Sequence, residues 1–203
     1  MSIFTAPGRS RKIRAILAGG VVVGLGAAVT LAAWNDSEFA TGTFTAGSFD
    51  MVGSADGTTF ASHTSAPGAA LTFSTNFNNM SPGTVVAAPF VVHLTPTTTT
   101  SATVSVASAT GALAAAPNLT YGIVTVANYA ACVPGATGTL VVPAGTGMSA
   151  ITGAQTFQLA KSVDGTATGA NVYLCIQVTA GAGLVQASTA TGTWDFLATS
   201  NVS

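Results

Sequence analysis

The residue types that most often act as nucleophiles, bases or metal ligands are scarce in this chain. It has two cysteines and two histidines, Cys132, Cys175, His63 and His93. Zinc sites need about four ligands at close spacing, which this set does not provide. Neither histidine lies in an H-E-x-x-H motif, and the chain has no G-x-S-x-G nucleophile elbow. We therefore predict no catalytic, metal-binding or cofactor-binding residues, and a protein that is not an enzyme.

A disulfide is the covalent chemistry that the sequence favours. An even cysteine count near β segments is typical of a disulfide in an exported protein; the alternative is a pair of buried free thiols. A bond between Cys132 and Cys175 would close a loop of about 40 residues and stabilise the fold by roughly 3–4 kcal/mol. His63, in a Ser/Thr-rich stretch, is expected to face solvent, and His93 is expected to be a structural side chain within a strand.

The distribution of charge points to export. Only 5% of the residues are charged, against roughly 25% in an ordinary soluble protein. Four of the five basic residues lie within residues 1–14, and the acids all follow: Asp36, Glu38, Asp50, Asp56, Asp164 and Asp195. A basic head before an acidic body is typical of a signal peptide. The body has no clustered basic patch, which argues against a nucleic-acid partner.

Residues 1–32 have the organisation of a signal peptide. The basic stretch 1–14 precedes an uncharged apolar run from Ala15 to Leu31, and small residues follow. Cleavage by a signal peptidase after Ala32 or Ala33 would release a secreted chain. The alternative is an uncleaved membrane anchor, since about 17–19 apolar residues can just span a bilayer.

The body of the chain is patterned as short strands. Val, Thr and aromatic residues, which favour strands, alternate with Gly, Pro, Asn and Ser clusters. Nine strands at this spacing predict an all-β fold, a two-sheet β-sandwich. The predicted strands are Thr43–Val52, Ala70–Phe77, Val85–Leu94, Ala102–Ala107, Leu119–Val126, Thr139–Val142, Thr156–Leu159, Asn171–Thr179 and Thr191–Ala198.

Alternation and turn residues support these strands. Within Asn171–Thr179, one face carries Val172, Leu174, Ile176 and Val178, and in the last strand Trp194 and Phe196 share a face. Turns are predicted at Pro82-Gly83, Pro134-Gly135 and Asp164-Gly165.

Three motifs resemble the TasA/camelysin family, whose members are exported through a signal peptidase of the SipW type. After the apolar run the chain reads Leu31-Ala-Ala-Trp-Asn-Asp-Ser-Glu-Phe, and then Phe44-Thr-Ala-Gly-Ser-Phe-Asp-Met. The turn Asn79-Met-Ser-Pro-Gly is similar to the family's Asn-Leu-x-Pro-Gly turn, and the closing strand is similar in kind. The resemblance implies a jelly-roll-like sandwich.

The resemblance also implies a function. The best-known family member is the main subunit of biofilm matrix fibres, and its segment after the cleavage site adds as a donor strand to the neighbouring subunit. Here residues 33–43 would be the donor strand and 44–203 the sandwich domain, giving a head-to-tail homopolymer. The donor residues are Ala33, Trp34, Asn35, Asp36 and Phe39, with Trp34 and Phe39 as apolar anchors and Asp36 and Glu38 facing solvent.

Two other functions remain open. A monomeric cell-surface binding module or adhesin would bind surface or matrix components through the loops Thr95–Ser101 and Ala131–Gly147. A camelysin-like protease is the third hypothesis, but the chain has no recognisable protease residues. It also departs from the fibre subunit by lacking its Lys- and Asp-rich loops and by carrying a cysteine pair.

Overall fold

The computed structural model describes residues 12–21, 37–74, 77–112 and 118–201. The chain divides into two units, Met1–Phe44 and Thr45–Ser203. In the first unit, residues 12–21 form a helix inside the predicted signal peptide, and residues 37–44 have no regular secondary structure. None of the helices in the described ranges has the length and apolarity that a membrane crossing requires. The predicted cleavage site at Ala32 and Ala33 lies outside the described residues.

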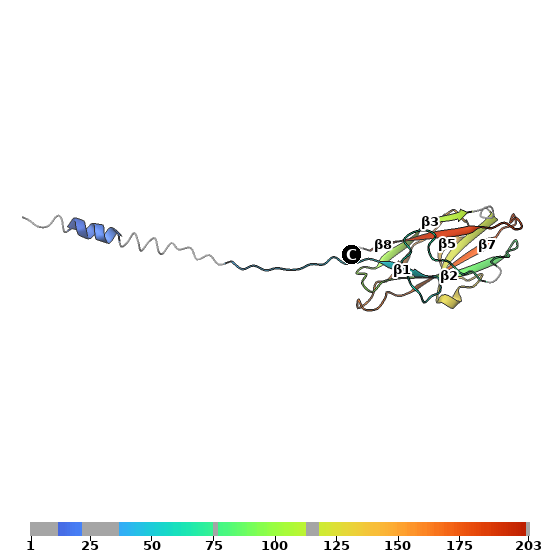
Figure 1. Ribbon diagram of the computed structural model, residues 1–203, viewed down its shortest axis with the longest axis horizontal. Helices are drawn as coiled ribbons and strands as arrows, with labels where there is room; N and C mark the ends of the chain where they lie inside the picture. The colour runs from blue at the N-terminus through green and yellow to red at the C-terminus, as the bar shows by residue number, and fades with distance from the viewer. Residues whose placement is uncertain (1–11, 22–36, 75–76, 113–117, 202–203) are drawn as a thin grey trace, which may run out of the picture. The chain divides into compact units, whose positions relative to one another are not determined.

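The second unit is a two-sheet antiparallel β-sandwich, which confirms the predicted fold class (Figure 1). One sheet has five strands in the order β1-β2-β7-β4-β5, and the other has three in the order β6-β3-β8. The strands are β1 Met51–Ser54, β2 Val85–Leu94, β3 Ala102–Ala112, β4 Leu119–Val126, β5 Thr139–Gly147, β6 Phe157–Leu159, β7 Val172–Ala180 and β8 Thr191–Ser200. A short 3-10 helix, η2, spans Tyr129–Ala131.

The strand predictions are largely confirmed, and two need correction. β2 and β4 have the predicted bounds, and most of the others differ by a few residues at their ends. Only Met51 and Val52 of the predicted strand 43–52 lie in β1. The described part of the predicted strand 70–77 forms no strand, because it meets β2 only through Ser74. The main-chain N–H of Ser74 donates to Ala87 O at 2.8 Å, but its hydroxyl replaces the returning backbone bond at 3.1 Å.

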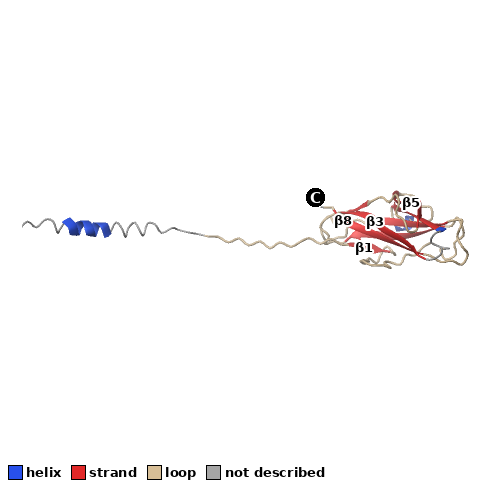
Figure 2. Ribbon diagram, turned by 90° about the horizontal axis from the view of Figure 1, so that it is seen from above, coloured by secondary structure: helices blue, strands red, loops and turns tan. Residues whose placement is uncertain are grey.

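The core lies between the two sheets, on the faces that alternation predicts. Leu174, Ile176 and Val178 of β7 are buried toward it, and Val172 packs against its margin. Burying a side chain of this size stabilises a fold by about 1.5–3 kcal/mol. Figure 2 shows β3 and β8 running together in the three-stranded sheet.

The outer face of the five-stranded sheet is covered as well. Val91 of β2 points away from the core and is fully buried. The loop after β1 and the turn at η2 lie over this face, joined by the hydroxyl of Tyr129, which donates to Ala55 O at 2.8 Å. Loops therefore cover this face of the sheet and bury its outward-pointing side chains.

Two turns have the pattern Ser-x-Asp-Gly-Thr, and the second confirms the predicted turn at Asp164-Gly165. In the first, Oδ1 of Asp56 accepts main-chain N–H bonds from Thr59 at 2.7 Å and Thr58 at 2.8 Å. Asp164 makes the same arrangement in the second turn. These main-chain donors hold the pKa of both carboxyls well below the ordinary value for Asp.

Candidate functional site

The two histidines lie in different environments. His93 is 5% exposed, its Nδ1 lies 2.8 Å from Oδ1 of Asn171, and its ring centroid lies 4.1 Å from that of Phe60. His63 is exposed. His93 is thus a packed structural side chain and His63 faces solvent, as the sequence predicts.

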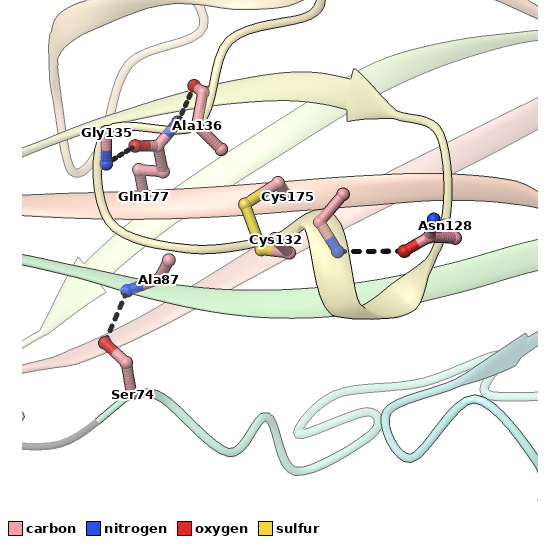
Figure 3. Close-up of a disulfide and its surroundings, with 9 residues drawn as sticks. Ser74, Ala87, Asn128, Cys132, Gly135, Ala136, Cys175 and Gln177 are labelled. Carbon is pink, nitrogen blue, oxygen red and sulfur yellow. Dashed lines mark hydrogen bonds between the residues drawn. A yellow bond between two sulfur atoms is a disulfide. The ribbon is translucent and has the colours of Figure 1, made fainter.

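Cys132 and Cys175 form the predicted disulfide, with their Cα atoms 5.1 Å apart. Figure 3 shows this bond joining the loop after η2 to β7, where Cys175 is fully buried. Gln177 holds the same loop, since its Oε1 accepts from Gly135 N at 2.7 Å and its Nε2 donates to Ala136 O at 2.8 Å. A structural disulfide is typical of an oxidising, extracytoplasmic compartment.

The two loops predicted as binding surfaces are tied to the sheets. In Thr95–Ser101, Thr98 is buried and its hydroxyl donates to Asp50 O at 3.0 Å. Ala131 ends η2 and the second half of Ala131–Gly147 is strand β5, so only residues 132–138 form a loop. The predicted strand Thr139–Val142 is confirmed and continues to Gly147, whereas the prediction of a loop over the same residues is wrong, because they extend the sheet beside β4.

Three of the four outer edges of the sheets are blocked. β1 has four residues, and its Gly53 exchanges two main-chain hydrogen bonds of 3.0 Å with Ala61. β5 contains Pro143, pairs with β4 through two register shifts, and receives a hydrogen bond from Gln155 N on Val141 O. β6 has only three residues. Short strands, prolines, bulges and covering segments are the features that prevent strand addition to an edge.

The fourth edge belongs to β8, which has ten residues and pairs with β3 alone. It contains neither proline nor lysine, and Asp195 is its one charged residue. Asn201 N donates to Ser101 O at 2.8 Å, so residue 201 and every second residue before it bond to β3.

The intervening residues of β8 direct their main-chain N–H and C=O groups to the open side. These residues are Gly192, Trp194, Phe196, Ala198 and Ser200. Within the part of the chain that the structure describes, none of these main-chain groups has a hydrogen-bond partner. β8 is therefore a long, unprotected edge.

β8 crosses the five-stranded sheet obliquely. Trp194 packs on Tyr121 of β4, with 5.5 Å between ring centroids, and Phe196 packs on Phe90 of β2 at 5.8 Å. The sheet register pairs Tyr121 with Val178, and Val178 with Val86, which is four residues before Phe90. The corner of the sheet at Val86 and Val178 therefore lies on the open side of β8.

A groove of about 650 Å³ occupies that corner. Val86, Val178 and Leu119, one from each of three neighbouring strands, line it from the five-stranded sheet. Trp194 and Gly192 contribute from β8. The loops before β2 and β8 complete the wall with Phe73, Met80, Leu184 and Ala190.

Trp194, which lines this groove, has an unpaired hydrogen-bond donor. Among the described residues, its Nε1 is the one buried side-chain polar atom without a partner. A buried N–H that makes no hydrogen bond costs about 1–3 kcal/mol. No charged side chain of the described residues lines the groove, although uncharged polar side chains such as Asn79 and Gln186 do, so the site fits an uncharged group.

The predicted donor strand is described only in part. Ala33, Trp34, Asn35 and Asp36 lie outside the described residues. Phe39 lies in the stretch without regular secondary structure, and its side chain is 94% exposed, as is that of Phe44. Both are exceptions to the rule that large apolar side chains are mostly buried.

These features define a disulfide-bonded, two-sheet β-sandwich with one bare edge and an uncharged groove beside it. No protein-family model matches the chain, and no curated protein matches it. The resemblance to the TasA/camelysin family therefore rests on the sequence motifs alone.

Sequence reasoning assigned no role to the edge of β8 or to Gln177. One signal for the edge was present, because proline lies within the predicted strand 85–94 and directly after the predicted strand 139–142 but is absent from the predicted strand 191–198. The position of Gln177 opposite Gly135 and Ala136 follows from the disulfide-held loop and has no local sequence signal.

Proposed function

We propose that this protein is a secreted structural subunit of a bacterial extracellular fibre or biofilm matrix. In this assembly the N-terminal segment of one copy adds as a strand to the sheet of the next copy. The bare edge of β8 carries the proposal. A ten-residue strand with one unpaired side is a template for a further strand, held by main-chain hydrogen bonds and by alternate side chains in pockets.

The segment 33–43 supplies the added strand. Alternation places Phe39 on the same face as Thr41 and Thr43, and places Glu38 on the opposite face. Phe39 is thus the apolar anchor of the inward face, while Glu38 faces solvent. Trp34 is five residues before Phe39, so a regular strand turns it to the other face.

Strand addition between copies gives a filament. The donor segment and the acceptor edge are different surfaces, so the contact is heterologous and repeats without closing on itself. The motifs shared with the TasA/camelysin family favour this assembly, and the disulfide agrees with export. The partners are further copies of this chain at the cell surface or in the matrix, together with matrix components, and a signal peptidase during export.

Electron microscopy tests the proposal with protein starting at Ala33 beside protein starting at Gly42. We expect filaments from the first and monomers from the second. Phe39→Ser should abolish filaments in the longer protein, whereas the matched control Thr41→Ser should leave them. Monomers from both lengths would overturn the proposal and favour a monomeric surface-binding module. Filaments from both would show that residues 33–41 are not the donor.

A further inference from the structure

We infer that the bare edge of β8 and the groove beside it form the acceptor site for the Phe39 segment of a second copy. This inference rests on the proposed function. It adds which of the sheet edges accepts the strand and which side chain fills the groove.

The edge beside β8 is favoured because the other exposed strand edges are occupied. The edges of β1, β5 and β6 are blocked, as described above. The N-terminal half of β2 is a further edge, because β1 pairs only with the C-terminal end of β2. Ala180 N donates to Thr84 O at 2.9 Å, so even-numbered residues of β2 bond to β7 and odd-numbered ones point outward. The outward positions include Ala87, which is bonded to Ser74, and Pro89, which has no N–H.

The groove and the segment match in chemistry. A strand that pairs with β8 on its open side lies over the corner at Val86 and Val178, and its inward side chains point into the groove. The groove has no charged lining among the described residues, and the part of the donor segment from Phe39 to Thr43 contains no charged residue. Its volume of about 650 Å³ lies within the range of sites that hold ligand-sized groups.

Trp194 offers main-chain groups to an added strand. Its N–H and C=O point to the open side of β8, and the residue lines the groove. An added strand therefore pairs with these main-chain groups while its inward side chains enter the groove.

A complementation experiment tests this acceptor site. Among the described residues, every strand and every core residue lies in Thr45–Ser203, so protein starting at Gly42 retains the sandwich. It keeps the acceptor and lacks the donor. Ala198→Pro in protein starting at Ala33 keeps the donor and removes an N–H on the open side of β8, without touching a hydrogen bond to β3. Ala198→Ser is the matched control that retains the N–H.

We expect each protein alone to be monomeric and an equimolar mixture to form a 1:1 heterodimer by analytical ultracentrifugation, while Ala198→Ser still forms filaments. Thermal unfolding of Ala198→Pro, with its disulfide intact, checks that it is folded.

The failures are distinguishable. If protein starting at Ala33 forms no filaments at all, the proposed function fails. If it does, but folded Ala198→Pro forms filaments equally well, the acceptor lies elsewhere and this inference alone fails. Dimers of the Gly42 protein by itself would mean that β8 pairs with another β8, which would also overturn it.

Discussion

Removing the disulfide should lower the free energy of unfolding by about 4 kcal/mol. Cys132 and Cys175 are 43 residues apart. For a closed loop of this length the chain-entropy model gives about 13 cal/mol/K, or about 4 kcal/mol at 25 °C. Removing the disulfide changes mainly the entropy of the unfolded chain, because Gln177 still holds the loop in the folded protein through its two hydrogen bonds. For a domain of this size, Tm should fall by about 8–16 °C.

Urea unfolding followed by tryptophan fluorescence measures this change. The variant Cys132→Ala with Cys175→Ala is compared with the oxidised wild type, and chemically reduced wild type is the control that keeps both side chains. Both should lose about the same stability, and the m-value should rise because the unfolded chain becomes more expanded. A loss below about 1 kcal/mol in both would refute the entropic argument. A loss in the Ala variant alone would assign the effect to packing at Cys175.

Three further predictions concern the sandwich itself. Gly122→Ala should destabilise the fold by about 1–3 kcal/mol, because a Cβ there would lie 2.8 Å from the backbone of β5, while the control Gly147→Ala meets no atom within 4 Å and should not; equal urea midpoints would contradict this. The pKa values of Asp56 and Asp164 are lowered in the folded protein. Their contribution to the free energy of unfolding is therefore fully present above the unfolded pKa of about 3.9 and is lost as pH falls below it. In the double variant Asp56→Asn with Asp164→Asn, the unfolding midpoint should change less between about pH 5 and pH 2 than in the wild type. An equal pH dependence in both proteins would contradict the role given to these two carboxyls. Tyr121→Phe should cost about 1 kcal/mol, since its hydroxyl donates to a backbone carbonyl at 2.7 Å. Because burial raises the Tyr121 pKa, wild type alone should lose this stability as pH rises above about 10.

The sequence predicts the sandwich well because its signals are local. Alternating apolar residues along β7 and the turn residues Pro82-Gly83 and Pro134-Gly135 act within a few positions. The main-chain bonds Thr84 N to Ser81 O and Ala136 N to Val133 O, with positive φ at Gly83 and Gly135, confirm both turns.

The candidate site could not be predicted in the same way, because it depends on contacts between distant segments. The groove joins Val86, Leu119, Val178 and Trp194 only after the three-stranded sheet has crossed the five-stranded one. Strand order decides which edge is left open, and neither hydropathy nor turn chemistry specifies that order. The same holds for the N-terminal segment, because the sequence shows its apolar residues but not the surface that they contact.

The scarcity of charged residues explains why the edges of these sheets are protected by other means, and the edge of β8 lacks them. Soluble β proteins commonly protect edge strands with lysine or with inward-pointing charges, but the only lysine after residue 14 is Lys161. This chain uses other means, namely Pro89 in β2, Pro143 in β5, and the segments that hold Ser74 and Ala61 against the sheet. A sequence that blocks its other edges without charges leaves the longest outer edge unblocked. An accidental gap of that kind would cause indiscriminate aggregation, whereas an edge reserved for one segment of the same protein would be covered in every copy except the last of a filament.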